Sequence, residues 1–347
     1  MIVHRAGLRV CIFFMLFTSL ISFHAFPAAA ESQGAGQDPK GGNVMTLAVD
    51  PLSPDNVYAG THRGIFKTMD GGVTWHSINR GLKGRDILTL AIDPTNSNTI
   101  YAGAYGGLFK SVNGGADWHS ANAGLEDTRV NKLIIDPINP NTLYAGTFGD
   151  VFKSRDGGRS WSPAGGGLTD TDIRTLAIDP GNPNVIYAGA FGGILKTTDG
   201  GIFWHPINQG MKHTNVRTLA IDPLNPGTIY AGAFGEILKS TDGGNRWSSL
   251  AGLNLTNIRS LALDPLKPNS IYAGAEGGIL KSINGGGTWF LINSGLADTD
   301  IRKVVINPKK TFILYAAAFG GVFKSIDGGA SWFGVNKGLS LPLATPP

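Results

Sequence analysis

The spacing of the tryptophans constrains this chain more than any other feature. Consecutive tryptophans are 43 residues apart, except for one step of 42 after Trp247. Seven tyrosines, from Tyr58 to Tyr315, keep the same period. A fixed period of about 40 to 50 residues indicates a repeat architecture in which each unit is one small supersecondary structure. The sequence therefore predicts seven copies of one unit, which together fill residues 43–339.

The fourth unit reads "DIRTLAIDPGNPNVIYAGAFGGILKTTDGGIFWHPINQGM". It contains four short β-prone runs, at residues 173–178, 185–190, 193–197 and 203–207, separated by turn signals such as Asp-Pro, Asn-Pro and Asp-Gly-Gly. No segment has the dozen periodic residues that a stable helix needs. Each unit is thus expected to be a four-stranded antiparallel meander.

A single meander of this size cannot bury both faces of its sheet, so the copies must pack on one another. Four-stranded repeats of this period are typical of propeller blades. The composition agrees, since glycine contributes 50 of 347 residues and charged residues only 16%. The predicted fold is all-β, a seven-bladed β-propeller of four-stranded antiparallel blades. We expect the ring to close by blade packing, with a clasp from residues 31–42 or 340–347 as the alternative.

The first thirty residues differ from the repeats. Arg5 and Arg9 precede the apolar run "VCIFFMLFTSLIS", and "FPAAA" follows it. This order is typical of a cleaved secretory signal peptide, with an uncleaved anchor as the alternative. We therefore expect a signal peptide at 1–30, a linker at 31–42, the propeller at 43–339 and a tail at 340–347. The expected location is secreted or periplasmic, with no membrane span after cleavage.

The mature chain is expected to contain no thiol, because Cys11 is the only cysteine and lies in the apolar run. Disulfides, thiolate catalysis and cysteine metal sites are then excluded. Without Arg5 and Arg9, the 29 basic residues become 27 against 25 acidic ones, a net charge of +2. Such a balance gives no reason to expect nucleic-acid binding. We expect a monomer without a cofactor.

A polar turn recurs before every tryptophan, with the pattern Lys-[Ser/Thr]-x-[Asp/Asn]-Gly-Gly-x-x-Trp. An Asp or Asn side chain can accept backbone N–H bonds within such a turn, and glycine allows a positive φ. A buried tryptophan ring then anchors the turn. The Asp or Asn residues are Asp70, Asn113, Asp156, Asp199, Asp242, Asn284 and Asp327. The tryptophans are Trp75, Trp118, Trp161, Trp204, Trp247, Trp289 and Trp332.

This turn resembles the Asp-box, also called the bacterial neuraminidase repeat (BNR). The fuller pattern looks most like the propellers of photosystem II assembly factors and of sortilin. The resemblance implies a binding platform in which the box is a folding device on the outer part of each blade, away from ligands. A catalytic role for the box would not survive the Asn at two positions. The box lysines are expected to extend over the outer blade surface with their charges in solvent.

In the resembling propellers, the first strand of each unit is innermost and begins at the channel mouth. After the first apolar residue of this strand, units one to three have Met45, Leu88 and Asn131, whereas the last four units have arginine. Guanidinium groups suit carboxylate and phosphate recognition. An arginine patch is also a feature of the resembling assembly factors. The predicted ligand-binding arginines are Arg174, Arg217, Arg259 and Arg302.

The alternative is that local acids neutralise these arginines. Asp172 and Asp300 lie two residues before Arg174 and Arg302, on the same side of an extended strand. The two intervening units have Asn215 and Asn257 there instead. Arg217 and Arg259 are therefore expected to be the less neutralised pair.

The turn between the second and third strands would open on the same face. It carries an aromatic residue in five units, and His62 and Glu276 in the other two. We include Phe191, Phe234 and Glu276 among the candidate ligand-binding residues, since aromatics can stack on sugars or hold apolar side chains. Packing between blades is the alternative and the commoner fate of a repeated aromatic. The five aromatics are Tyr105, Phe148, Phe191, Phe234 and Phe319.

The competing class is a glycoside hydrolase, which usually needs two carboxylates. Glu236 and Glu276, in or beside the mouth turns of neighbouring units, form the best pair among four glutamates. A sialidase would also need a tyrosine nucleophile, for which only Tyr105 is placed. The xyloglucanases that this chain resembles use two propellers with the cleft between them.

His76, His119 and His205 fall in separate units, which argues against a metal site. The sequence thus favours a non-enzymatic scaffold, without catalytic or metal-binding residues. It is expected to bind a protein or an anionic or carbohydrate ligand at the channel mouth, in the manner of an assembly factor. A purely structural surface protein is a third interpretation.

Overall fold

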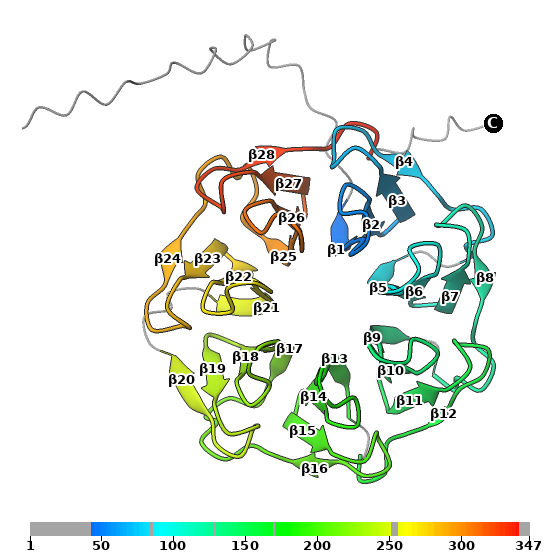
Figure 1. Ribbon diagram of the computed structural model, residues 1–347, viewed down its shortest axis with the longest axis vertical. Coiled ribbons are helices and arrows are strands. Elements are labelled where there is room, and N and C mark those ends of the chain that lie inside the picture. Colours follow the sequence, from blue (N-terminus) through cyan, green and yellow to red (C-terminus); the bar gives the residue numbers. More distant parts are fainter. Residues whose placement is uncertain (1–42, 84–85, 128, 169–170, 251–255, 340–347) are drawn as a thin grey trace, which may run out of the picture. The chain divides into compact units, whose positions relative to one another are not determined.

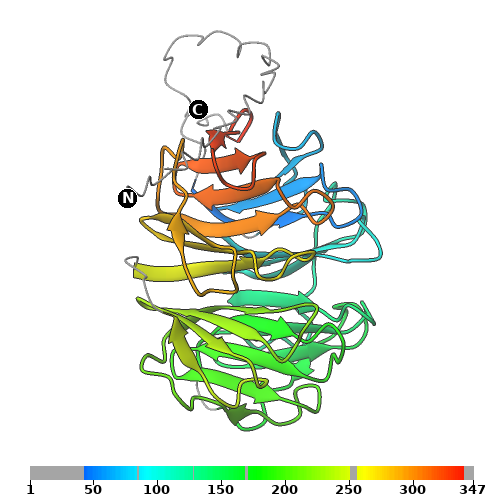
Figure 2. The same ribbon diagram turned by 60° about the vertical axis from the view of Figure 1, so that its left-hand side comes forward.

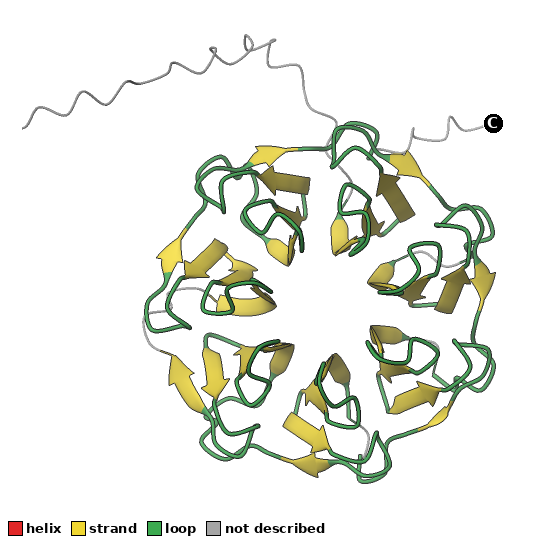
Figure 3. Cartoon of the chain, viewed as in Figure 1, coloured by secondary structure: helices red, strands yellow, loops and turns green. Residues whose placement is uncertain are grey.

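Seven four-stranded antiparallel sheets form a closed ring in the computed structural model (Figure 1). The structure describes residues 43–83, 86–127, 129–168, 171–250 and 256–339; strands and turns make up these ranges, and they contain no helix (Figure 3). The predicted seven-bladed propeller is confirmed. The predicted signal peptide, linker and tail lie outside the described residues.

Each blade, numbered one to seven along the chain, is built from four consecutive strands. The innermost strands are β1 (Val44–Val49), β5 (Ile87–Ile92), β9 (Val130–Ile135), β13 (Ile173–Ile178), β17 (Val216–Ile221), β21 (Thr256–Leu263) and β25 (Ile301–Ile306). The second strands are β2 (Val57–Thr61), β6 (Ile100–Ala104), β10 (Leu143–Thr147), β14 (Ile186–Ala190), β18 (Ile229–Ala233), β22 (Ile271–Glu276) and β26 (Leu314–Ala318).

The third strands are β3 (Gly64–Thr68), β7 (Gly107–Ser111), β11 (Val151–Ser154), β15 (Gly193–Thr197), β19 (Ile237–Ser240), β23 (Gly278–Ser282) and β27 (Gly321–Ser325). The outermost strands are β4 (His76–Ser77), β8 (His119–Ser120), β12 (Ser162–Pro163), β16 (His205–Pro206), β20 (Ser248–Leu250), β24 (Phe290–Leu291) and β28 (Phe333–Gly334).

The core lies between neighbouring blades, whose sheets stack face to face (Figure 2). The second strand β14, with the sequence IYAGA, is buried along its whole length. One apolar cluster combines Tyr144 and Val151 of blade three with Ile173 and Leu176 of blade four. Each blade thus buries its faces only against its neighbours, because a single meander cannot cover both faces of its own sheet.

The glycine in the middle of the second strand allows this close packing. A Cβ on Gly189 would come within 2.6 Å of the Thr175 side chain and 2.7 Å of the Val216 side chain in the next blade. Such distances leave no space for a methyl group, so a larger residue would push the innermost strands apart.

The outermost strand is shorter than the sequence predicts. In blade four the predicted run covers 203–207, but only His205 and Pro206 pair with β15. The N–H groups just before them are already used: that of Phe203 donates to Asp199 Oδ1 (3.1 Å), and that of Trp204 donates to Gly166 O (2.8 Å). The box turn therefore takes residues that alternation alone would assign to a strand.

The box turns form a hydrogen-bonded outer layer, as predicted. Asp199 Oδ1 accepts the Thr197 hydroxyl (2.6 Å) and the N–H of Ile202 (2.9 Å). The indole N–H of Trp204 donates to Ala164 O (2.7 Å), and its side chain is 1% exposed. These bonds satisfy the polar groups of a tight turn and fix the ring against the preceding unit.

The box lysines do not extend into solvent, so that prediction is wrong. The ammonium of Lys196 donates to Gly243 O of the next blade (2.8 Å) and lies 5.3 Å from the centre of the Tyr187 ring. The hydroxyl of Tyr187 donates to the same carbonyl (3.2 Å). All seven box lysines donate to the corresponding glycine carbonyl. They are contacts between blades.

The same contacts close the ring. Lys324 Nζ and the Tyr315 hydroxyl of blade seven donate to Gly71 O of blade one, at 2.7 and 3.1 Å. The indole N–H of Trp75 donates to Val335 O (2.7 Å). Closure by blade packing is therefore confirmed for the part of the chain that the structure describes.

Candidate functional site

One residue near the start of each innermost strand, which we call the bulge residue, stands outside the regular strand pairing. It is the second residue of the strand in six blades, and in blade six it is Arg259, the fourth residue of β21. In β13, Ile173 pairs with Ala190 and Thr175 with Gly189, which leaves Arg174 in a β-bulge. The register shifts at the corresponding place in all seven blades. A bulge redirects the side chain of the extra residue, so the fold presents this position repeatedly at one end of the ring.

These seven residues line one cavity of about 430 Å³, which we call the mouth cavity. The four predicted arginines share it, as the sequence indicated. Its lining residues are Met45, Leu88, Arg129, Asn131, Asp172, Arg174, Arg217, Arg259 and Arg302.

Arg129 is a fifth guanidinium group that the sequence analysis missed. It lies just before the innermost strand of blade three, where blades four and seven have Asp172 and Asp300. Its Nε donates to Asn131 Oδ1 (3.1 Å), so blade three has a base where blades four and seven have an acid, and a neutral amide where they have an arginine. An arginine in place of the repeated Asp or Asn was the available signal.

Arg174 is neutralised in the way predicted for a local acid. Its Nε lies 2.9 Å from Asp172 Oδ2, and another guanidinium nitrogen donates to Asn215 of the next blade. Asp172 Oδ1 also accepts the amide of Asn131 (3.2 Å). A chain of polar contacts thus runs around the mouth cavity from blade three to blade five.

Arg259 was expected to be poorly neutralised, and this prediction is wrong. Its guanidinium forms ion pairs with Glu276 of its own blade and with Asp300 of the next blade. Asp300 also lies 3.4 Å from Arg302, as predicted. The mouth turn of blade six and the next blade therefore supply the acids for Arg259, because the residue two positions before it, Asn257, is not an acid.

Arg217 matches its prediction, since no hydrogen bond or ion pair joins its side chain to any other described residue. Its Nε is buried without an acceptor. Asn257 in the next blade corresponds to Asp300, the acid with which Arg259 pairs. It is not an acid, and its amide donates to Glu276 Oε1 (2.8 Å). Burial and the charges of Arg174 and Arg259 lower the pKa of Arg217. Its neighbourhood therefore disfavours the positive charge, and an added anion would relieve this.

The aromatic residues of the mouth turns are exposed, so the interpretation as packing between blades is wrong. The exposed fractions of Phe191 and Phe234 are 63% and 52%. Arg174 lies 5.5 Å from the centre of the Phe191 ring, and Arg129 lies 5.0 Å from that of Tyr105. Phe148 also lies beside Arg129, 5.8 Å from its guanidinium carbon, so three of the five rings lie beside guanidinium groups. The mouth cavity thus has a partly aromatic border.

Glu236 and Glu276 have different surroundings. Glu236 is 7% exposed, and its Oε1 is buried without a partner in the described ranges. It stands where most blades have a glycine, as does Asp150 in blade three. Asp150 accepts the Val151 N–H (2.6 Å), the bond that Asn208 provides to Ile194 in blade four. Its position therefore assigns Glu236 to the turn, whereas Glu276 belongs to the arginine network.

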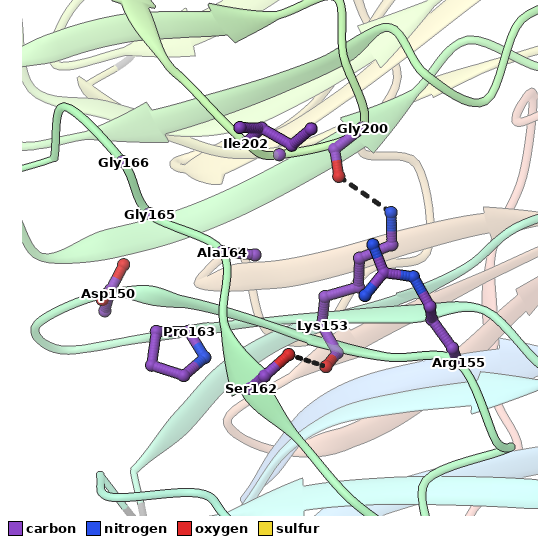
Figure 4. A pocket seen from close by; sticks show the side chains of 11 residues that line it. Asp150, Lys153, Arg155, Ser162, Pro163, Ala164, Gly165, Gly166, Gly200 and Ile202 are labelled. Carbon is purple, nitrogen blue, oxygen red and sulfur yellow. Dashed lines mark hydrogen bonds between the residues drawn. The ribbon is translucent and has the colours of Figure 1, made fainter.

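A second cavity of about 420 Å³ lies between blades three and four, near the outer edge (Figure 4). Its lining includes Asp150, Lys153, Arg155 and Gly165. The corresponding groove between blades two and three has a volume of about 180 Å³ and contains Asn122 where the larger one has Gly165. Smaller side chains account for the larger volume. In Figure 4, Lys153 points to Gly200 O, its usual contact between blades.

The described residues contain neither a cluster of metal ligands nor a helix that could span a membrane. No group of three His, Cys, Asp or Glu side chains is arranged to hold a metal ion among them. Within the same ranges, no helix has the length and apolar character needed to cross a membrane.

This chain resembles known proteins in its three-dimensional structure. No family model matches this chain, and no curated protein sequence matches it. The GH74 xyloglucanase from Xanthomonas campestris superposes with a TM-score of 0.75 at 16% identity, over 86% of this chain and 55% of the xyloglucanase. This chain therefore spans about half of that enzyme's length.

Two other similar structures are not described as hydrolases. YCF48 from Cyanidioschyzon merolae gives a TM-score of 0.65 at 15% identity, over 83% of this chain and 96% of YCF48. YCF48 is also known bound to D1 peptide. The extracellular domain of the one-component system BT4673 from B. thetaiotaomicron matches with a TM-score of 0.65 at 16% identity, over 83% of this chain and 39% of that domain. At these identities the likeness shows the fold, which fits both binding proteins and glycoside hydrolases.

Proposed function

We propose that this protein is a non-enzymatic extracytoplasmic scaffold that binds an acidic segment of a partner protein in the mouth cavity. The observation that carries the proposal is Arg217, a partly buried guanidinium without a partner among the described residues. Two of its neighbours in the cavity, Arg174 and Arg259, are also arginines, and they disfavour its charge. A carboxylate from a ligand would supply the missing acceptor.

The charge balance of the mouth cavity supports an anionic ligand. Five guanidinium groups line it, while three carboxylates pair with them, those of Asp172, Glu276 and Asp300. Two positive charges are left in excess. Arg129 and Arg217 are the two arginines of the cavity without an ion pair in the described ranges. Guanidinium groups prefer planar, bidentate acceptors such as carboxylates.

The aromatic border favours a protein segment over a small ion. The exposed ring of Phe191, beside Arg174, offers apolar surface at the cationic cavity. A peptide that carries acidic and apolar side chains could use both features at once. YCF48, which is similar in fold, has been seen with a bound peptide. The expected signal peptide and the extracellular domain among the similar structures support an extracytoplasmic location. We propose that residues 43–339 act as one monomeric domain.

Partner capture tests this proposal. The full-length mature protein is immobilised and exposed to the native extracytoplasmic extract, and bound proteins are identified by mass spectrometry. The quadruple variant R174A/R217A/R259A/R302A should retain at least about tenfold less of the partner, because several charge-assisted bonds are lost. The control K267A/K310A/R159A/R246A removes four exposed charges outside the mouth cavity and should bind normally. Unchanged capture by the quadruple variant, or no saturable partner at all, would contradict the proposal.

A glycoside hydrolase is the second candidate, because the fold is shared with GH74 enzymes and Glu276 lies at the mouth. Two observations weigh against it. Glu276 is paired with Arg259, and Glu236 is enclosed in its turn. The purified protein should therefore leave xyloglucan, other β-glucans and sialosides intact. Turnover that disappears in Glu276→Gln would favour the hydrolase instead.

A further inference from the structure

The cavity between blades three and four, which we call the interblade cavity, depends on an exchange of two residues in blade three (Figure 4). Five of the other blades have a glycine at the position of Asp150 and an asparagine at the position of Gly165. In blade four, a Cβ on Gly193 would clash with the Asn208 side chain, so the space holds one side chain. In blade three, a Cβ on Gly165 would clash with the Asp150 carboxylate. Asp150 therefore fills the space of the asparagine from the opposite segment.

The exchange adds a charge that the turn does not need. Asp150 Oδ1 accepts the Val151 N–H (2.6 Å), as Asn208 does for Ile194, and a neutral amide serves this bond equally well. Asp150 forms no ion pair with another described residue. Burial raises the pKa of Asp150, and the charge of Glu126 adds to this. A cationic group beside the carboxylate would offset both effects.

Arg155 supplies the opposite charge. Its side chain is exposed and has no hydrogen bond or ion pair with another described residue. Figure 4 shows Asp150 and Arg155 at opposite ends of the lining. Strand β11 separates the two residues, so their backbones are about 16 Å apart at the rise of an extended chain. The other blades have uncharged residues at the position of Arg155: Met69, Val112, Thr198, Thr241, Ile283 and Ile326.

Small and apolar residues form the middle of the interblade cavity. Pro163, Ala164 and Ile202 lie between the two charged ends (Figure 4). None of the described lining residues is aromatic, so the cavity offers no ring on which a sugar could stack. Gly165 and Gly166 also line it, and their N–H groups donate to no other described residue. These groups are suited to donate to the carbonyls of an extended peptide.

We propose that the interblade cavity binds a short extended peptide segment, which places a basic group beside Asp150 and an acidic group beside Arg155. A segment of about five residues spans the distance between the two charges. Each end would form a charge-assisted hydrogen bond, and a segment with the charges exchanged would be repelled at both ends. The site lies near the outer edge of the ring, apart from the mouth cavity, and does not depend on the proposed function.

Isothermal titration calorimetry of the full-length mature protein tests this site. The probes are capped pentapeptides in which three alanines separate a lysine from a glutamate, in both sequence directions. The wild type should bind at least one of them saturably, and a peptide with glutamine at both ends should bind at least about tenfold more weakly.

Two single variants remove one charge each. R155T installs the residue of blades four and five, and D150N keeps an acceptor for the Val151 N–H. Each should weaken binding of the charged peptide about tenfold, because one charge-assisted bond is lost. R246A removes an exposed positive charge in blade five and should bind normally.

The double variant D150G/G165N reverses the exchange and restores the pair of residues that five other blades have. It returns a side chain to the segment after the outermost strand and removes the acidic end of the cavity. Binding should disappear at peptide concentrations that saturate the wild type. The melting temperature should stay close to that of the wild type, because the asparagine can accept the Val151 N–H as Asn208 accepts that of Ile194.

Each outcome decides the matter. Saturable binding that weakens in R155T and D150N and disappears in D150G/G165N supports the site. Absence of binding by the wild type, equal binding of the glutamine peptide, or binding that survives in D150G/G165N overturns the inference. Binding lost in R217A but kept in D150G/G165N would assign the peptide to the mouth cavity, which overturns this inference and leaves the proposed function intact.

A measurement on the wild type covers the case in which the variants do not fold. Backbone amide signals are followed by NMR during titration with the charged peptide. Those of Gly165, Gly166 and Ile202 should shift, whereas that of Gln209, which corresponds to Gly166 in blade four, should not. Shifts confined to residues outside the interblade cavity would overturn the proposal.

Discussion

The outer rim and the hub of this propeller use repetition differently. We take the rim as the box turns with the outermost strands, and the hub as the seven residues at the bulges of the innermost strands, from Met45 to Arg302. At the rim, every box lysine donates to the same glycine carbonyl of the next blade. At the hub, the residue at the bulge changes from Met45 to Arg302 around the ring, and Arg217 is left without a partner among the described residues.

The repeated contacts of the rim therefore suit a structural role, whereas the variable positions of the hub suit recognition. A contact made in every blade holds the blades together and cannot distinguish one partner from another. A position that varies on an otherwise repeated scaffold costs little stability and breaks the symmetry, as specific recognition requires. Rim substitutions should therefore change stability, and hub substitutions should change binding.

The largest expected effect is at the rim. Trp204→Ala removes a side chain that is 1% exposed and leaves Ala164 O without its donor, so we expect a loss of about 3–5 kcal/mol in the free energy of unfolding. Urea denaturation followed by circular dichroism measures it. The matched variant is Trp289→Ala, whose indole N–H has no acceptor among the described residues. It should cost about 1 kcal/mol less. Equal losses would show that the indole hydrogen bond contributes nothing.

The loss of stability at acidic pH should also originate at the rim. Hydrogen bonds from the Thr197 hydroxyl and the Phe203 N–H lower the pKa of Asp199, and the pKa of the other four box aspartates is lowered as well. A lowered pKa in the folded state means that the unfolded chain binds more protons. The stabilisation is therefore complete above about pH 4 and is lost as the pH falls through the folded pKa.

Two variants test this pH dependence through the melting temperature between pH 6 and pH 2.5. Replacing the five box aspartates with asparagine should flatten the acid decline, because the sites then no longer titrate. Asn284→Asp adds a sixth titrating box and should steepen it. Its Oδ2 could accept the Thr288 hydroxyl, which accepts the Asn284 amide at present (3.0 Å). Parallel declines in all three proteins would assign the acid sensitivity to other groups.

The smallest expected effect on stability is at the hub. Arg217→Met breaks no hydrogen bond in the described structure and removes a buried Nε without an acceptor. The free energy of unfolding should change by less than about 1 kcal/mol. Arg259→Met is the comparison, because it leaves Glu276 and Asp300 without their guanidinium and should destabilise more. A large loss in Arg217→Met, measured by urea denaturation, would contradict the view that hub residues contribute little to stability.

The sequence predicted the fold well because the fold depends on local, repeated signals. The period determines the number of blades, and the run at 173–178 corresponds to β13 without an error in its bounds. The bulges of the seven innermost strands, such as that at Arg174, place the corresponding residues around one cavity, as the comparison of units suggested.

The errors concern contacts between units. The acids predicted for each arginine lie within its own strand, but Arg259 pairs with Asp300, 41 residues away in the next blade. Six of the seven box lysines bond to a glycine 46 or 47 residues further along the chain, and Lys324 bonds to Gly71 across the ring closure. The exposure of Phe191 depends on how far its turn projects beyond the sheet, which its own sequence does not state. The period predicts the strands within a unit, whereas the side-chain contacts between units depend on how the blades pack, which the sequence of one unit does not specify.

The junction between blades seven and one has a consequence for how such a chain could evolve. Its contacts through Tyr315, Lys324 and Trp75 equal those at junctions that the backbone also crosses. The covalent connection is therefore not what holds neighbouring blades together. A circular permutation that opened the polypeptide at another junction would preserve every side-chain contact. Additional modules could accordingly be fused at several points of the circumference without altering the mouth cavity.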